Sequence, residues 1–299
     1  MTNGTSGENR LTKNDRRSAA REKARQLREE QKKKERRNRY FLQGGIVVGA
    51  LAIIAVVTLI IFNSIKPAGP GPANMASDGI VFGEGLKAQR TSALQPNDTP
   101  ATSTARPPGK AVDIRIYHDY LCPFCAKFEQ ANNEQLKGMV NSGAATVEFH
   151  PLALLTSRSA GTKYSLRAAN AAACVANFSP DQFYDFNSAL FVDQPAEGSA
   201  GRTDAELKTL VASSGVQDTS SVNSCIDNGT YKDWVQQASA RATAGPLPGT
   251  SEPKITGTPT VLVDGVRYPG SPFDKDEFAA FVTNAAAKSY STPSPAPAP

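Results

Sequence analysis

The chain is short of the residues that bind transition metals. Its 299 residues include only four cysteines and two histidines. A structural zinc site needs four such ligands, usually supplied as two closely spaced pairs. Cys122 and Cys125 form one close pair, but Cys174 and Cys225 stand 51 residues apart, and the two histidines form no second pair. The sequence therefore predicts no metal site.

Charge is absent from one long segment. Residues 40–62, YFLQGGIVVGALAIIAVVTLIIF, contain no Asp, Glu, Lys or Arg. As a helix, residues 41–62 would rise about 33 Å, enough to cross a bilayer core of about 30 Å, so we predict a transmembrane anchor there. A cleaved signal peptide has shorter basic and apolar regions, and ANMAS at 73–77 is a poor cleavage site. The buried helix of a soluble protein, the other alternative, is seldom so long and uniformly apolar.

Positive charge is concentrated before this segment. Residues 1–43 carry 14 Lys or Arg and 6 Asp or Glu, whereas the rest of the chain carries 19 and 22. A basic flank stays in the cytoplasm, so we predict a single-pass protein of the cell membrane with residues 1–40 as a cytoplasmic tail and the remainder outside. Basic runs can bind nucleic acid, but contact with anionic membrane lipid is the simpler interpretation. We expect no nucleic-acid partner.

Composition divides the exported part into three. Residues 63–110 are rich in Pro, Gly, Ser and Thr, which predicts a linker. Within it, GIVFGEGLKAQ could form a short strand or hairpin. Residues 111–288 predict a folded domain, and residues 289–299, which end in STPSPAPAP, predict a disordered tail.

The folded domain is predicted to be α/β. Its expected order is strand, helix, strand, a helical block, a hairpin and a last helix. The first three elements form a βαβ unit, whose strands are parallel and whose crossover is right-handed. Asp264-Gly265 is typical of a two-residue hairpin turn. The expected ranges are 111–120, 122–140 and 145–155 for the βαβ unit, about 158–245 for the helical insertion, 258–270 for the hairpin and 271–289 for the last helix.

The motif DYLCPFC places two cysteines between a strand and a helix. Pro123 suits the first helical position, so Cys122 falls at the N-cap, where the helix dipole and free N–H groups stabilise an anion. The pKa of the Cys122 thiol should therefore fall below about 8.5, which makes it the nucleophile. Cys125 lies one turn further in and would resolve a mixed disulfide. Outside the cytoplasm such a pair suits thiol–disulfide exchange; a structural staple and half of a zinc site are the alternatives.

These motifs together resemble the DsbA family of exported, thioredoxin-like thiol:disulfide oxidoreductases. The resemblance rests on DYLCPFC, on the helical block and on GTPTVLVDG, and it covers about residues 78–288. The basic tail with a single anchor resembles the membrane-tethered members found in actinobacteria. The resemblance implies a thioredoxin-like fold with an inserted helical domain, preceded by one transmembrane helix. It also implies that Cys122 and Cys125 are the redox pair and that no cofactor is needed.

The resemblance assigns further residues and partners. Thr258-Pro259 matches the cis-proline peptide that faces the nucleophile, where an extended substrate would pair with the backbone; a trans proline at a strand start is the alternative. The implied partners are reduced or unfolded exported proteins and a quinone-linked membrane reoxidant of the DsbB or VKOR type. The chain departs from the family at Phe124, where familiar oxidases have His, and at Ile116, where many relatives have a buried acid. These departures point to a milder oxidant.

The remaining candidate residues surround this pair. If Cys122 pairs with Cys125, Cys174 and Cys225 are left to join two helices of the insertion in a structural disulfide, which family members of this type often carry. Asp119, three residues before Cys122, either modulates the thiol pKa and relays a proton or caps the helix or faces solvent. We expect the two histidines to be packing or surface residues.

Three functions remain open from the sequence. The first is an oxidase that forms disulfides in exported proteins. The second is a reductase or isomerase on the same fold, although isomerases are usually dimers and no dedicated dimerisation domain is evident. The third is a binding module with a static disulfide. Such a module needs neither Cys-Pro-x-Cys nor Thr-Pro, so the sequence favours the oxidase.

Overall fold

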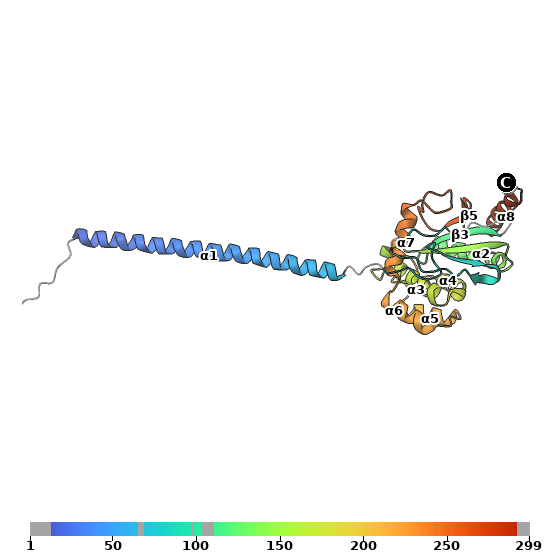
Figure 1. Ribbon diagram of the computed structural model, residues 1–299, viewed down its shortest axis with the longest axis horizontal. Coiled ribbons are helices and arrows are strands. Elements are labelled where there is room, and N and C mark those ends of the chain that lie inside the picture. The colour runs from blue at the N-terminus through green and yellow to red at the C-terminus, as the bar shows by residue number, and fades with distance from the viewer. Residues whose placement is uncertain (1–12, 65–68, 97, 103–110, 292–299) are drawn as a thin grey trace, which may run out of the picture. The chain divides into compact units, whose positions relative to one another are not determined.

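The computed structural model describes residues 13–64, 69–96, 98–102 and 111–291. The chain divides into two compact units, Met1–Pro67 and Ala68–Pro299, and each is described by itself (Figure 1). Most of the tail predicted to be disordered, residues 292–299, lies outside the described residues.

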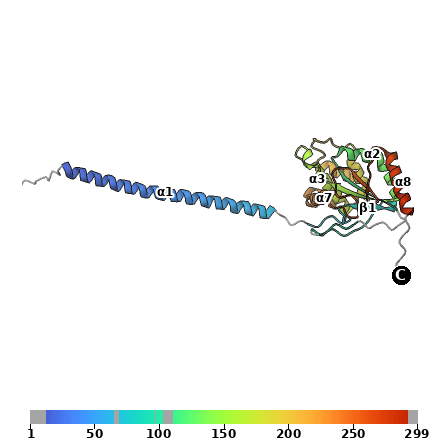
Figure 2. The same cartoon turned by 90° about the horizontal axis from the view of Figure 1, so that it is seen from above.

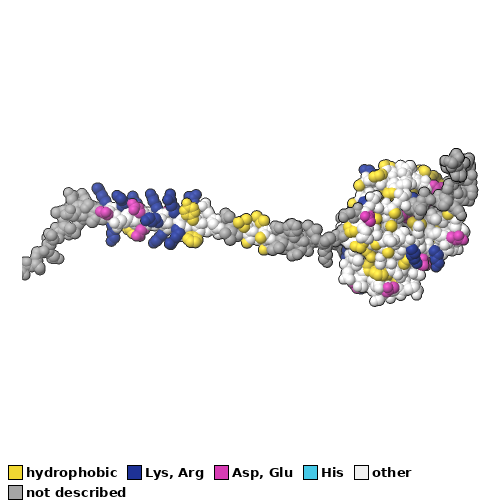
Figure 3. All heavy atoms as spheres, viewed as in Figure 1, with side chains coloured by type: hydrophobic (Ala, Val, Ile, Leu, Met, Phe, Trp, Pro, Cys, Tyr) yellow, Lys and Arg dark blue, Asp and Glu magenta, His cyan; other side chains and the backbone are white. Residues whose placement is uncertain are grey.

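The first unit is one helix, α1, which spans Lys13–Ser64. The basic segment and the apolar segment form one continuous helix. The predicted cytoplasmic tail is therefore helical from residue 13. Lys and Arg side chains surround its N-terminal part, and apolar side chains follow (Figure 3). Among the described residues, Arg21–Val56 is the one helical stretch long and apolar enough to cross a membrane, by length and composition. It is a candidate membrane anchor.

The second unit is built on a six-stranded sheet of order β2-β1-β4-β3-β5-β6. The central strands β3 and β4 are parallel, as a βαβ unit requires, and all the other neighbours are antiparallel. Asp264 and Gly265, between β5 and β6, both have positive φ, as a tight hairpin turn of this sequence requires. The strands are β1 Ile80–Gly83, β2 Lys87–Ala88, β3 Val112–Asp119, β4 Ala145–Leu152, β5 Thr260–Val263 and β6 Val266–Arg267.

Helices cover this sheet. Helix α2 connects β3 to β4 and packs against α8, and the two lie side by side in Figure 2. The remaining helices form the insertion, in which α3 and α7 contact β4 while α5 and α6 pack on α3. The helices are α2 Pro123–Asn141, α3 Tyr164–Phe178, α4 Phe183–Phe191, α5 Asp204–Ser213, α6 Thr219–Asn228, α7 Lys232–Ala244 and α8 Lys275–Ser291, with short 3₁₀ turns at Glu84–Leu86, Thr156–Arg158 and Pro180–Gln182.

The insertion is held to the sheet by aromatic packing. Phe82 of β1 and Phe149 of β4 pack edge-on against Tyr184 of α4, with ring centroids 5.7 and 5.3 Å apart. Phe183 completes the cluster, and all four side chains are buried. Apolar burial of this kind is the main favourable term in folding. It makes the sheet and the insertion one core.

The prediction that residues 63–110 form a linker is wrong for the part of 69–102 that the structure describes. Residues 69–96 and 98–102 belong to the folded unit, with Met75, Ile80 and Phe82 fully buried. Gly71 serves close packing, because a Cβ there would lie 2.7 Å from the Trp234 ring. The short strand foreseen in this segment is present as β1, which adds to the sheet beside β4.

A disulfide joins two helices of the insertion. Cys174 of α3 and Cys225 of α6 are bonded, with their Cα atoms 5.9 Å apart and 51 residues between them in sequence. Both cysteines are buried. A cross-link that closes a loop of this length is worth about 4 kcal/mol in the chain-entropy model.

Candidate active site

Cys122 and Cys125 lie where β3 meets α2. Cys122 is the N-cap residue of α2 and Pro123 occupies its first position. The turn is closed by the N–H of Cys122, which donates to the carbonyl of Asp119 at 3.0 Å, and by the N–H of Cys125, which donates to the carbonyl of Cys122 at 3.0 Å. Both cysteines are thiols and nearly fully buried. The structure thus places this pair at the positive end of a helix dipole.

The two thiols of this pair have opposite pKa shifts. The hydrogen bond from the Cys125 thiol, together with Thr258 and the N–H groups of Phe124 and Cys125, lowers the pKa of Cys122 from 9.0 to about 6, although burial opposes this. Burial raises the pKa of Cys125 well above its usual value, and its hydrogen bond to Cys122 adds to the rise. Since the thiolate is the reactive form, Cys122 is the more readily activated thiol of the pair at neutral pH.

The Thr258-Pro259 peptide faces the nucleophile. Its bond is cis, and the Cys122 thiol donates to the carbonyl oxygen of Thr258, with Sγ and O 3.2 Å apart. The sheet causes this approach, because Pro259 precedes β5 and Thr260 of β5 pairs with Tyr117 of β3. Two segments 136 residues apart therefore meet at one sulfur atom.

A cleft opens beside these residues. Its volume is about 240 Å³, and Phe124, Thr258, Pro259 and Tyr268 are among the residues that line it. Phe124 is 54% exposed although it stands between the two cysteines, and Phe273 beside it is 43% exposed. Their rings stack with centroids 5.8 Å apart.

Lys127 adds a charge to this aromatic pair. Its Nζ lies 5.7 Å from the ring centroid of Phe124 and 5.0 Å from that of Phe273, which is the distance of a cation–π contact. The rim at Phe124 is therefore an aromatic surface with a cation above it. Such a rim can hold an apolar side chain that neighbours a cysteine in an extended peptide.

Asp119 is fully buried, and the hydrogen bonds of its carboxylate go to groups other than the two thiols. Its carboxylate accepts hydrogen bonds from the N–H groups of Leu121 and Leu155 and from the hydroxyl of Ser165, at 2.9, 2.9 and 2.6 Å. Burial raises its pKa, and these hydrogen bonds oppose the rise. Its side chain neither caps α2 nor faces solvent, and it is the backbone of Asp119, not the carboxylate, that forms a hydrogen bond with the Cys125 thiol. Asp119 instead ties the turn before Cys122 to the segment after β4 and to α3.

Sequence reasoning missed two further polar residues, of which Gln194 holds the turn at Cys122. Gln194 donates from Nε2 to the carbonyls of Tyr120 and Cys122, at 2.9 and 3.1 Å, and so holds the same turn from outside. Glu129 lies one helical turn after Cys125 on the buried face of α2, where burial raises its pKa to about 7. The position of Glu129 on an otherwise apolar helix face could have been recognised from the sequence. No sequence pattern indicates that Gln194, 72 residues from Cys122, contacts this turn.

Both histidines are buried on the sheet. His118 of β3 packs edge-on against Tyr120 and Phe191, and burial lowers its pKa to about 3, so it is neutral. His150 of β4 has Nε2 at 3.3 Å from Glu148 Oε1. In the described part of the chain, no group of three or more His, Cys, Asp and Glu side chains is placed to hold a metal ion.

Comparisons with known proteins agree with this geometry. A family model described as thioredoxin matches residues 109–284. The reduced disulfide bond oxidoreductase DsbG from Mycobacterium tuberculosis is similar, with 28% identity, 75% of this chain and 95% of that chain covered, and a TM-score of 0.53. Reduced DsbA from the same organism has 26% identity, coverages of 71% and 98%, and a TM-score of 0.52.

A more distant solved structure supports the fold alone. BdbD from Bacillus subtilis has 21% identity, with 74% of this chain and 100% of that chain covered and a TM-score of 0.51. No curated protein sequence matches significantly. The fold is thioredoxin-like with an inserted helical domain.

Proposed function

Because this chain belongs to the thioredoxin family, with DsbA-type oxidoreductases among its structural relatives, we propose that it forms disulfides in exported proteins at Cys122-Pro-Phe-Cys125. The observation that carries this proposal is the pKa difference between the two thiols, set at a helix N-terminus opposite a cis Thr258-Pro259 peptide.

The reaction starts from the Cys122–Cys125 disulfide. A substrate thiolate attacks Sγ of Cys122, the bond to Cys125 breaks, and Cys125 leaves with the electron pair and takes up a proton because its pKa is high. A second substrate thiolate then attacks the substrate sulfur of the mixed disulfide and releases Cys122 as a thiolate. The substrate loses two electrons and gains a disulfide, and the enzyme is left as the reduced pair.

The thiolate of Cys122 favours this direction. A thiolate stabilised at pKa about 6 lowers the free energy of the reduced enzyme, and a stable reduced form makes the disulfide a strong oxidant. It also makes Cys122 a good leaving group in the second step. A reductase or isomerase is the alternative on the same fold, and it would require a less oxidising pair.

The cleft positions the substrate for attack. The backbone at Thr258, next to Cys122 Sγ, is suited to pair with an extended substrate segment, strand to strand. The exposed rings of Phe124 and Phe273 would then contact the side chain next to the substrate cysteine.

Membrane attachment completes the proposal. We place α1 across the membrane with its basic end in the cytoplasm and against anionic lipid, which leaves the second unit outside. A membrane protein of the DsbB or VKOR type would take the two electrons from the reduced pair and restore its disulfide. Disulfides persist outside the cytoplasm, so the reaction has a compartment in which its product survives.

The test is oxidation of a reduced protein by the full chain in lipid nanodiscs. The oxidised chain is mixed with reduced, unfolded ribonuclease A, and disulfide formation is followed by mass spectrometry of alkylated samples. We expect one substrate disulfide per Cys122–Cys125 disulfide consumed. If the chain instead leaves ribonuclease reduced and accelerates the reduction of insulin by dithiothreitol, it is a reductase.

Protease treatment of intact cells that carry the chain tests its orientation. External protease should remove the second unit and leave α1. Protection of the second unit until the cells are lysed would contradict the proposed placement.

A further inference from the structure

A second cavity lies apart from the cysteine site. Its volume is about 440 Å³, it is partly open to solvent, and it is lined by the end of α7, the loop at 245–248, strands β3 and β4, and residues 77–78 and 99–100. None of the residues that line it lines the cleft beside Cys122. Cavities of roughly 300 to 1,000 Å³ are typical of small-molecule sites. This cavity is therefore large enough for a ligand of its own.

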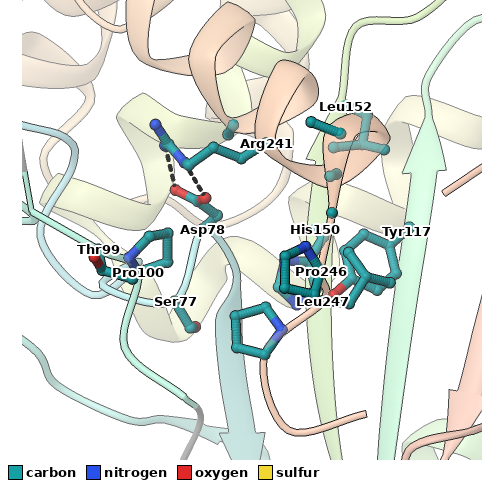
Figure 4. Close-up of a pocket in the computed structure, with 15 residues that line it drawn as sticks. Ser77, Asp78, Thr99, Pro100, Tyr117, His150, Leu152, Arg241, Pro246 and Leu247 are labelled. Carbon is teal, nitrogen blue, oxygen red and sulfur yellow. Dashed lines mark hydrogen bonds and ion pairs between the residues drawn. The ribbon is translucent and has the colours of Figure 1, made fainter. Parts of the chain in front are cut away.

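The walls of this cavity are mostly carbon. Leu152 of β4, Ala242 of α7 and Pro246 line it (Figure 4). A water molecule held in a cavity needs two to four polar partners, and these walls offer few. Water is then poorly held, and an apolar guest gains free energy when it displaces such water.

The one ion pair in the wall is already satisfied. Arg241 donates from Nε and Nη2 to the two carboxylate oxygens of Asp78, each at 2.7 Å. Figure 4 shows this pair at one side of the cavity, with Tyr117 and His150 at the other. A charged ligand would lose its hydration without finding an unpaired opposite charge, which is costly. The cavity thus favours a neutral molecule.

Tyr117 supplies an unused hydrogen-bond donor. Its side chain lines the cavity and is 4% exposed, and its ring stacks on His150 with centroids 4.2 Å apart. Its hydroxyl makes no hydrogen bond with any described residue, which leaves it able to bond a guest in the cavity. Burial raises the pKa of Tyr117, so the hydroxyl keeps its proton and can donate it.

We propose that this cavity binds a small, neutral, mostly apolar molecule that carries a carbonyl oxygen. The carbonyl accepts from the hydroxyl of Tyr117, and the apolar body lies against Leu152, Ala242 and Pro246. A hydrocarbon of the same shape fits the walls but leaves the hydroxyl without its partner.

Benzophenone is a suitable probe, because it is a neutral aromatic ketone that forms cross-links to nearby C–H groups under ultraviolet light. The full chain in nanodiscs is irradiated with increasing benzophenone, and the modified peptides are mapped by mass spectrometry. We expect saturable labelling of residues 238–248. Labelling only of α1, or only of the cleft around Phe124 and Tyr268, would overturn the proposal.

Matched variants of α7 test whether the cavity itself is occupied. Ala242→Leu places a larger side chain in the cavity and should reduce labelling of residues 238–248 more than 10-fold. Ala240→Leu makes the same change at an exposed position of the same helix, and labelling should stay as in the parent chain. Equal labelling of both variants would show that the probe lies elsewhere.

Tyr117→Phe tests the hydrogen bond without a change of shape. Since the hydroxyl has no partner among the described residues, the variant should fold as the parent does. One hydrogen bond corresponds to about a 3- to 10-fold rise in the benzophenone concentration that gives half-maximal labelling. Diphenylmethane lacks the carbonyl and should compete with benzophenone for the cavity. After correction for the weaker binding of benzophenone to Tyr117→Phe, the affinity of diphenylmethane should be the same in the variant and in the parent chain. An unchanged half-maximal concentration in Tyr117→Phe would contradict the assignment of the carbonyl to this hydroxyl.

Discussion

The two cysteine pairs of this chain are both buried, yet they differ in every other respect. Cys122 and Cys125 are thiols three positions apart at the start of a helix, next to a cleft. Cys174 and Cys225 lie inside two packed helices and are bonded to each other across 51 residues. The first pair has hydrogen bonds that stabilise one thiolate. All four cysteines belong to one apolar core, but the second pair lies between α3 and α6 and is closed as a disulfide.

This difference shows that surroundings, and not burial, separate a reactive cysteine from a structural one. A thiolate needs hydrogen-bond donors or nearby positive charge, and the N-terminus of α2 provides them for Cys122. A structural disulfide needs only two cysteines with suitable Cα spacing on two packed elements. Experiments that exchange or remove these surroundings should therefore affect the two pairs in different ways.

The largest expected effect is on activity, from Cys122→Ser. A serine cannot form the mixed disulfide, so oxidation of reduced ribonuclease A should fall at least about 10³-fold, to the uncatalysed rate. Cys125→Ser whose Cys122 has first been joined to glutathione in a disulfide should exchange glutathione for a substrate thiolate, with glutathione leaving as the thiolate, and should then accumulate a Cys122–substrate mixed disulfide that reductant removes. Activity retained in Cys122→Ser would show that another residue is the nucleophile.

Removal of the second pair should affect stability. The double variant Cys174→Ala, Cys225→Ala should lose about 4 kcal/mol in the free energy of unfolding, measured with guanidinium chloride. Its Cys122 pKa should stay within about 0.3 units of the parent, because the groups that shift this pKa do not include Cys174 or Cys225. A large change in that pKa would mean that the disulfide helps to build the redox site.

Asp119→Asn tests a residue that binds the turn and not the thiol. The amide cannot accept all three hydrogen bonds made by the carboxylate, so we expect a loss of about 1–3 kcal/mol in stability. Asp227→Asn, at an exposed side chain, should change stability by less than about 0.5 kcal/mol. If Asp119→Asn leaves stability intact and shifts the Cys122 pKa by a unit or more, the carboxylate acts on the thiol.

The pH dependence of Cys122 follows from its lowered pKa. The rate of alkylation by iodoacetamide should rise with a midpoint at about pH 6. The thiolate stabilises the reduced folded chain fully above about pH 9, the ordinary thiol pKa, and this stabilisation is lost as the pH falls through about 6. Cys125→Ala removes the strongest hydrogen bond to the thiolate and should raise the midpoint. A midpoint near 9 in the parent chain would contradict the site geometry.

The smallest expected effect concerns the aromatic rim. Phe273→Ala removes the ring that stacks on Phe124 and should raise KM for a peptide with an apolar residue beside its cysteine by about 2- to 5-fold. The kcat should hardly change, because neither thiol is touched. Phe178→Ala, at another exposed phenylalanine, should leave KM unchanged. Equal KM values in both variants would remove the rim from substrate recognition.

Local features of the site could be predicted from the sequence because their causes are local. Pro123 after Cys122 predicts a helix start, and Asp264-Gly265 predicts a tight turn; the structure has both. The fold class followed from the order of such elements. The roles of Cys122 and Cys125 in exchange stay predictions until activity is measured.

The rest depended on contacts between distant segments. Residues 69–102 have the composition of a linker, yet they pack because Gly71 allows close approach to Trp234. Asp119 meets Ser165, and Gln194 meets the carbonyl of Cys122, only in the folded chain. No local pattern encodes such pairs.

The reduction potential of Cys122–Cys125 tests the proposed function most directly. The full chain in nanodiscs is equilibrated with glutathione buffers, and the reduced fraction is read from alkylation of Cys122. We expect a potential between about −120 and −180 mV, the range of DsbA and protein disulfide isomerase. A value of about −270 mV, as in thioredoxin, would mean that the chain donates electrons to disulfides and does not form them.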